Sequence, residues 1–274
     1  MRSLSVVLSL LLVAAVKSQE NWNYTRKGDD WEGVCQTGIR QSPINILSRW
    51  TIPRFAGLPL RLSNYDQEVP VTVTVDQHHF TIRIDPDPSV RIAISGGGLR
   101  GNYVLQSAHF HYGSEHLIDT KRYALEAHLV HYREIYGNRT DAATNDPEGI
   151  AVLGTLYCEA TANSNLEQVL QGANGEQVKL RFRDFLPRNL DFYRYQGSLT
   201  TPPCSEAVVW TVFKNSLPIS QQQVDAIKGN FPDDVTSTYR NVQRLNTRRV
   251  ERWGFRSGFQ SKVDFLKSSL NILG

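Results

Sequence analysis

Short runs rich in β-branched and aromatic residues recur along the chain, and they constrain its fold more than any other feature. Turn-forming stretches such as Asp85–Pro88 and Gly96–Gly98 separate most of these runs, as is typical of β-strands. Helical periodicity is weak, apart from a short candidate around Ser220–Ile227. The pattern predicts one β-dominated domain with strands at Val71–Val75, Phe80–Ile84, Val90–Ile94, Tyr103–Tyr112, Ala124–Tyr132, Ile150–Tyr157, Val178–Phe182 and Ala207–Phe213.

The first eighteen residues have the form of a secretory signal. Arg2 precedes an apolar run from Leu4 to Val16, and small residues near Ser18 offer a cleavage site. The run is too short for a comfortable transmembrane helix and ends at Lys17. The alternative is a buried N-terminal helix. We expect a secreted, extracellular protein from which residues 1–18 have been removed.

Length and charge set limits on the mature chain. About 255 residues suit one large domain as well as two, and no linker, low-complexity tract or obvious repeat divides them. Removing Arg2 and Lys17 with the signal leaves 28 basic and 27 acidic residues. This near balance gives no reason to expect a nucleic acid or an anionic membrane as the main partner.

The cysteines and two glycosylation motifs also fit an exported chain. Cys35, Cys158 and Cys204 imply one disulfide and one leftover thiol, and the residues alone allow three pairings. The sequons that begin at Asn23 and Asn138 predict N-glycosylation on a eukaryotic secretory route.

Five of the seven histidines lie between residues 109 and 131. His109 and His111 are two residues apart in a strand-like run, so their rings would share one face of the strand. His128 lies in the next run, and it can face both rings if the two strands pair. Three neutral imidazoles on two strands leave the fourth position of a zinc ion open to water, which is the arrangement of a catalytic site.

The alternative is that these histidines are ordinary polar residues on a solvated face of a sheet. The neighbours of His128 favour the metal site, because Glu126 and Val130 share its face. The carboxylate can orient a ligand imidazole, and the valine can line an apolar cavity. His131 points to the opposite face and is predicted to be a core histidine. His116 lies in the connection between the runs and is predicted to be structural.

Five sequence blocks stand in order along the chain: Gln41–Ile46 (Gln-Ser-Pro-Ile-Asn-Ile), His109–His111, Ser114–His116, Glu126–His131 and Gly197–Cys204 (Gly-Ser-Leu-Thr-Thr-Pro-Pro-Cys). Together they resemble the alpha-class carbonic anhydrases over roughly Trp22 to Val250, nearly the whole mature chain. The resemblance implies a large central twisted, mostly antiparallel sheet with a few short peripheral helices. It also implies reversible hydration of carbon dioxide to bicarbonate and a proton by zinc-bound hydroxide, with Zn2+ held by His109, His111 and His128.

The resemblance assigns further roles near the metal. Thr200 would accept a hydrogen bond from the hydroxide and donate one to Glu115, because an ionised carboxylate can only accept. Thr201 would border the bicarbonate, and the alternative for Thr200 is a simple turn residue. An apolar wall for carbon dioxide would consist of residues that could equally be ordinary core: Val130, Val152, Leu199, Val208 and Trp210.

The resemblance also names residues outside the metal site. His78 would carry protons to the solvent, since an unperturbed imidazole titrates near neutrality; the alternative is an exposed loop histidine. Tyr24 would belong to a network of ordered water. Cys35 and Cys204 would form the disulfide, which leaves Cys158 as a buried thiol.

The match is imperfect at several positions. Ser107 stands where the family usually has glutamine, and its side chain is too short to reach His109 in the usual way. Tyr112 replaces a tryptophan, and Asn241 replaces a proline. Residues 19–250 would form the catalytic domain and residues 251–274 a C-terminal extension. Polar residues such as Lys267 and Asn271 interrupt this extension and argue against a membrane anchor.

Two other functions are compatible with parts of the sequence. A secreted binding protein could keep the fold without the activity, but such relatives typically lose a zinc histidine, and all three are present here. A zinc hydrolase would need features such as His-Glu-x-x-His, which does not occur in this chain. We expect a monomeric enzyme whose partner is a small molecule, carbon dioxide or bicarbonate.

Overall fold

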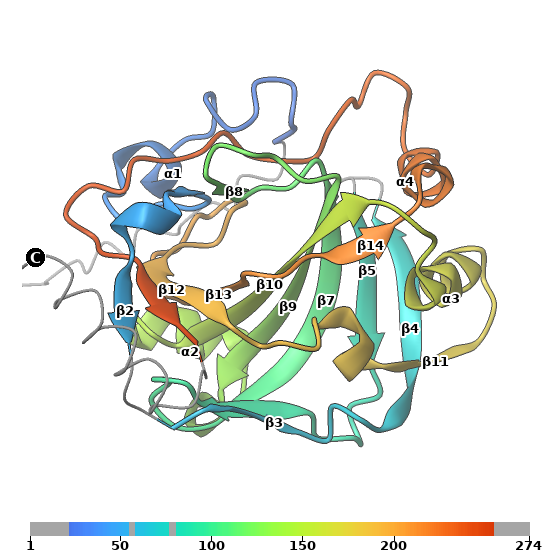
Figure 1. The fold of residues 1–274 in the computed structure, drawn as a ribbon, viewed down its shortest axis with the longest axis horizontal. Coiled ribbons are helices and arrows are strands. Elements are labelled where there is room, and N and C mark those ends of the chain that lie inside the picture. The colour runs from blue at the N-terminus through green and yellow to red at the C-terminus, as the bar shows by residue number, and fades with distance from the viewer. Residues whose placement is uncertain (1–21, 55–57, 77–80, 255–274) are drawn as a thin grey trace, which may run out of the picture.

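The computed structural model describes residues 22–54, 58–76 and 81–254. Within these residues, thirteen strands form one large twisted sheet (Figure 1). They are β2 (Ile52–Arg54), β3 (Leu60–Ser63), β4 (Glu68–Asp76), β5 (Thr81–Pro86), β6 (Ala93–Gly96), β7 (Tyr103–Tyr112), β9 (Leu125–Arg133), β10 (Ile150–Glu159), β11 (Val178–Arg181), β12 (Phe192–Gly197), β13 (Val208–Phe213), β14 (Leu217–Ile219) and β15 (Glu251–Trp253). A small parallel pair consists of β1 (Asn45–Ile46) and β8 (Leu117–Ile118).

The main path of the sheet runs β11-β4-β5-β7-β9-β10-β13-β12-β15-β2. Most neighbours are antiparallel, and the exceptions are β10 with β13, β10 with β14, and β15 with β2. The predicted β-dominated single domain with a mostly antiparallel sheet is therefore confirmed. The long strands β7, β9 and β10 lie side by side in the middle of the sheet, which makes them a rigid base for a site.

The helices described are short: α1 (Val34–Thr37), α2 (Arg139–Asn145), α3 (Ser164–Ala173), α4 (Gln221–Lys228) and the 3-10 turns η1 (Ser48–Trp50), η2 (Glu134–Tyr136) and η3 (Phe182–Phe185). The predicted helix near Ser220 is confirmed as α4. The Ser220 side chain accepts a hydrogen bond from the Gln223 amide, and the Gln223 side chain accepts one from the Ser220 amide, which satisfies two free amides at the start of the helix. No helix in the described part of the chain is long and apolar enough to cross a bilayer.

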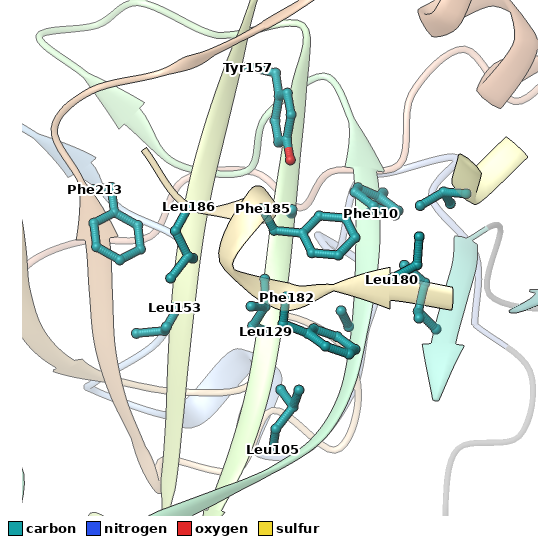
Figure 2. Close-up of a cluster of buried hydrophobic side chains, with 14 of the residues drawn as sticks. Leu105, Phe110, Leu129, Leu153, Tyr157, Leu180, Phe182, Phe185, Leu186 and Phe213 are labelled. Carbon is teal, nitrogen blue, oxygen red and sulfur yellow. The ribbon is translucent and has the colours of Figure 1, made fainter. Parts of the chain in front are cut away.

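The sheet separates two apolar clusters. The larger contains Leu105, Phe110, Leu129 and Leu153 from the central strands, covered by aromatic side chains of η3 (Figure 2). The smaller contains Val130, Val152, Val208 and Trp210 from the opposite face of the same strands. Successive residues of a strand point to opposite faces, and nearly every residue of β9 and β10 is buried, so both faces of these strands are covered.

Candidate metal site

An irregularity in β7 decides which face the histidines occupy. Tyr103 and Leu105 point into the larger cluster, and strict alternation would send His109 and His111 there as well. The pairing with β9 shifts between Leu105 and Ser107, so Gln106 is an extra residue, as in a β-bulge. Beyond it the alternation is reversed. Ala108 and Phe110 enter the larger cluster, and His109 and His111 turn to the opposite face.

Three imidazoles converge on that face. His109 is the direct cross-strand partner of His128, and His111 is the partner of Glu126. The ring centroids of His109, His111 and His128 lie 5.1, 5.2 and 4.7 Å apart in pairs. One ring nitrogen from each lies within 4.8 Å of the other two. His128 therefore faces both histidines of β7, as the spacing of the two runs predicts.

In His111 and His128, a hydrogen bond to one ring nitrogen determines which nitrogen remains available to a metal. The Thr238 carbonyl lies 2.6 Å from His111 Nδ1 and can only accept, so that nitrogen carries the proton. His111 Nε2 is buried without any hydrogen-bond partner. Glu126 Oε1 lies 2.9 Å from His128 Nε2, which leaves Nδ1 of His128 facing the other rings. Neutral imidazoles with their second nitrogen held by an oxygen are a donor set that suits a zinc ion.

A second group of candidate ligands shares His128 and consists of His116, Glu126 and His128. These side chains are already bonded to one another, because Glu126 Oε1 also accepts from His116 Nδ1 at 2.7 Å. The backbone amide of His116 donates to Glu126 Oε2 at 2.8 Å. Both carboxylate oxygens of Glu126 are therefore engaged. Glu126 and His116 thus hold the His128 ring in place for the group of His109, His111 and His128. His116 has the structural role predicted for it.

A buried chain of hydrogen bonds continues from His116 toward the loop that carries Thr200. His116 Nε2 lies 2.6 Å from the Tyr195 hydroxyl, which donates to Ser42 Oγ at 2.9 Å. Ser42 Oγ also accepts from the Ser198 amide. Ser198 directly precedes Leu199 and Thr200, so one connected network holds both a metal-site histidine and this loop.

Burial lowers the pKa of two of the site histidines, His109 and His111. The pKa of His109 lies well below its usual value, chiefly because the ring is buried. The charges of the other two site histidines and of Arg83 and Arg139 lower it further. Burial also lowers the pKa of His111, against the opposing effect of Glu115. Burial alone would raise the pKa of Glu126. The charges of His116 and His128 and their hydrogen bonds to the carboxylate outweigh burial, so the pKa of Glu126 lies well below its usual value.

Glu115 is buried beside the three rings. Its Oε1 accepts from the Arg240 amide at 2.9 Å. Its Oε2 has no hydrogen-bond partner and lies 3.6 Å from His111 Nε2 and 4.0 Å from His128 Nδ1. Thr200 is also buried, with 5% of its surface exposed. The hydrogen bond expected from Thr200 to this oxygen is not formed here, so Glu115 keeps one free acceptor next to the site.

The expected apolar wall lies beside the histidines. Val152 pairs with Val130 on one side and with Trp210 on the other, so the three side chains share the histidine face. Val208 is in the same buried cluster, and Leu199 is partly buried against it. The Trp210 ring contacts His128, with centroids 4.8 Å apart. Thr201 is partly exposed in the adjoining loop.

The N-terminal segment closes the site on another side. Cys35 and Cys204 form a disulfide, and they pack with Trp22, Tyr24 and Trp31. The Tyr24 ring centroid lies 6.5 Å from that of His111. The pairing implied by the family resemblance is thus present in the structure.

The expectation of a buried Cys158 was wrong, because this thiol is partly exposed near the end of β10, 3.2 Å from Ser216 Oγ. Asn23 and Asn138 are exposed, and Asn138 caps α2 through the Asp141 amide. His78 lies outside the described residues, as do residues 1–18 and the extension beyond residue 254.

Several residues that support the site were not found from the sequence. Thr238, Tyr195 and Arg240 supply hydrogen bonds to His111, His116 and Glu115 from remote segments. Two of them act through backbone atoms, which any residue type possesses, so their identity carries no signal. Only Tyr195 acts through its side chain, because a buried tyrosine hydroxyl usually needs a hydrogen-bond partner.

Comparison with known proteins agrees with this geometry. The model of the eukaryotic-type carbonic anhydrase family matches residues 17–253. Carbonic anhydrase 6 of Mus musculus is 34% identical, covering 92% of this chain and 86% of the relative. A putative carbonic anhydrase 5 of Caenorhabditis elegans is 32% identical, covering 90% and 87%. Carbonic anhydrase 15 of Mus musculus is 33% identical, covering 91% and 89%.

Proposed function

Because the chain belongs to the eukaryotic-type carbonic anhydrase family, we propose that it hydrates carbon dioxide reversibly at a zinc ion held by His109, His111 and His128. The observation that carries this proposal is the set of three converging imidazole nitrogens, one of which, His111 Nε2, is buried without a partner. Zinc at such a site supplies a nucleophile from water near neutral pH, an effect for which carbonic anhydrases are the usual example.

The residues around the metal would orient the reaction. Glu115 Oε2 is a buried acceptor that lacks a donor, and the Thr200 hydroxyl is the side chain that we assign to it. Once Thr200 donates to this carboxylate, its oxygen is left as an acceptor and can hold the nucleophile in one orientation. Thr201 would border the bicarbonate product.

Carbon dioxide is small and apolar, so its recognition needs an apolar wall and few donors. Val130, Val152 and Trp210 share the histidine face, and Leu199 and Val208 adjoin them. We assign these five residues to the binding of carbon dioxide. Hydration of carbon dioxide forms a bicarbonate ion and a proton, and the proton must leave the site. We assign the transfer of this proton to His78, and we assign to Tyr24 a role in ordering the water between the two.

We also infer that the chain is exported as a glycoprotein, with the catalytic domain at residues 19–250 and an extension at residues 251–274. The support is the signal-like N-terminus, the two exposed sequon asparagines and a disulfide, which persists in oxidising compartments. A small molecule is the only partner that this function requires, and we propose that the protein is a monomer.

A carbon dioxide hydration assay on the zinc-loaded mature protein tests the proposed activity. The wild-type protein should hydrate carbon dioxide, and His128→Ala should lose most of its zinc and activity, because His128 contacts both other rings. An aromatic sulfonamide, which binds zinc in this family, should inhibit the wild-type protein. A fully active His128→Ala variant would refute the assignment.

A further inference from the structure

A buried arginine stands on the face of the sheet opposite the histidines. Arg194 lies in β12 between Tyr193 and Tyr195, whose side chains belong to the smaller apolar cluster on the histidine face. Because residues alternate along a strand, Arg194 points to the other face, as Phe192 does. Only 6% of its surface is exposed, and its guanidinium lies 5.0 Å from the centroid of the Phe192 ring. Arg194 therefore has no part in the chemistry proposed above.

Two N–H groups of Arg194 lack an acceptor. Its Nε and Nη2 are buried without a hydrogen-bond partner in the described part of the chain. These nitrogens form one edge of the guanidinium, and the parallel N–H groups of that edge can hold both oxygens of a carboxylate. Thr211, the direct cross-strand partner of Arg194, points to the same face, and its Oγ1 is also buried without a partner. Unpaired buried polar groups are costly, so an anion at this edge would be stabilising.

The carboxylate opposite Arg194 is held by other donors. Glu251 of β15 is the cross-strand partner of Arg194 on its other side. Its Oε1 accepts from Arg54 Nε at 2.8 Å, and its Oε2 accepts from Trp253 Nε1 at 3.0 Å. Burial lowers the pKa of Arg194 to about 10, and the charge of Glu251 opposes this effect without cancelling it. Arg194 is thus a buried cation whose nearest acid in the sheet is already paired.

Arg194 borders a pocket of about 300 Å³ in which positive charge is in excess. Arg248 and the exposed Arg249 also line this pocket. Arg248 donates to three backbone carbonyls and, among the residues described, pairs with no carboxylate. Besides Glu251, the acid in the lining is Glu148, whose Oε2 pairs with Arg100 Nε at 2.8 Å. Both acids of the pocket are therefore neutralised from outside it, and the three arginines that line it are not.

We propose that this pocket binds a small dicarboxylate, with one carboxylate on the Nε–Nη2 edge of Arg194 and the other beside Arg249. A planar carboxylate matches the parallel N–H groups of a guanidinium edge. That edge lies below the pocket surface, so the Arg194 side chain must turn toward the pocket when the ligand binds. Gly98, which also lines the pocket, leaves room for this turn, because a Cβ there would lie 3.9 Å from Arg194 Nη1.

Arginine side-chain NMR on the mature protein tests the site. Succinate is the probe, and succinamide is the neutral control of the same shape. Succinate should shift the Nε signal of Arg194 saturably, whereas succinamide should not. The loss of this signal in Arg194→Lys assigns it.

Arg194→Lys keeps the positive charge but lacks the parallel N–H groups. Calorimetry should therefore show that succinate binds this variant roughly tenfold more weakly, as expected when a hydrogen bond to a charged group is lost. Arg181→Lys is the matched control, because it makes the same change at an exposed arginine that pairs with Glu68. It should bind succinate as the wild-type protein does.

A second variant keeps the proposal testable if Arg194→Lys does not fold. Arg249 is exposed, so Arg249→Gln should fold normally, and it should weaken the succinate response of the Arg194 signal by about threefold, as expected for an exposed ion pair. An Arg194 signal that succinate does not shift, equal shifts with succinamide, or equal affinity in Arg194→Lys and Arg181→Lys would overturn the proposal.

The hydration assay is independent of this result, because the pocket lies on the opposite face of the sheet from the three histidines. An inactive protein with a normal succinate response would refute only the proposed function. An active protein without the response would refute only the dicarboxylate site.

Discussion

His131 differs from the three site histidines because protein atoms hold both of its ring nitrogens. Nδ1 donates to the Ala151 carbonyl at 3.1 Å, and Nε2 accepts from the Tyr65 hydroxyl at 2.6 Å. The ring is fully buried, and burial lowers its pKa to about 4. His131 therefore stays neutral in the folded protein over a range in which the unfolded chain binds a proton.

This difference predicts a loss of stability in mild acid. The pKa of His131 is lower in the folded state than in the unfolded state, where it is about 6.5. The contribution of the neutral ring is therefore complete above pH 6.5 and is lost as the pH falls toward 4, by about 3 kcal/mol at most. The free energy of urea unfolding should show that His131→Gln costs less at pH 4.5 than at pH 7.5. An equal cost at both pH values would contradict this account.

At the residue scale, the sequence predicts the opposed directions of His128 and His131 because strand alternation has a period of two. The same rule places Glu126 beside His128. The sequence does not predict which oxygens hold the rings. The Thr238 carbonyl reaches His111 only through the folding of a remote loop, 127 residues along the chain.

At the scale of elements, the disulfide ties the N-terminal segment to the loop that carries Thr200. Cys204 follows that loop, and its carbonyl accepts from the Gln41 side chain. Arg240 donates to the Cys35 carbonyl and, through its amide, to Glu115. Loss of the disulfide should therefore disturb both Thr200 and Glu115 without removing a metal ligand.

We predict that replacing Cys35 and Cys204 with serine lowers the free energy of unfolding by up to about 5 kcal/mol, the chain-entropy value for a loop of this length. The cysteines are 169 residues apart in the sequence. Cys158→Ser is the matched control and should change stability little. Hydration activity of the double variant should fall at temperatures where zinc is still bound. Unchanged activity under these conditions would show that the disulfide does not position the loop.

The elements themselves were only partly predictable. Tyr103–Tyr112 has the bounds predicted, whereas the run at Val90 becomes a strand only from Ala93. Strand β12 and helix α3 were missed, since each carries polar residues at positions that only tertiary packing explains. Arg194, for example, is buried within β12. The bulge at Gln106 was also missed, because no residue type marks it.

At the scale of the whole molecule, the site combines segments from across the chain on one face of a rigid sheet. A buried site of this kind needs a route for protons to the solvent, and the family resemblance assigns that route to His78.

We predict that His78→Ala slows turnover at saturating carbon dioxide but preserves kcat/KM, because proton transfer follows the chemical step. Small imidazole buffers should restore the lost rate. Equal loss of kcat and kcat/KM in stopped-flow assays would place His78 in another role.

The fold class and the convergence of the three candidate metal-binding histidines could be predicted from the sequence, because both depend on local periodicity and on motifs with fixed spacing. The carbon dioxide substrate came from the family resemblance alone.

The central claim is that three imidazoles hold the metal, and X-ray absorption at the zinc edge of the wild-type protein tests it most directly. The account predicts one zinc per chain with three imidazole nitrogens and one oxygen at about 2.0–2.1 Å. A shell of two imidazoles and a carboxylate would instead indicate the group of His116, Glu126 and His128, and a sulfur ligand would exclude both groups. Either result would contradict the account.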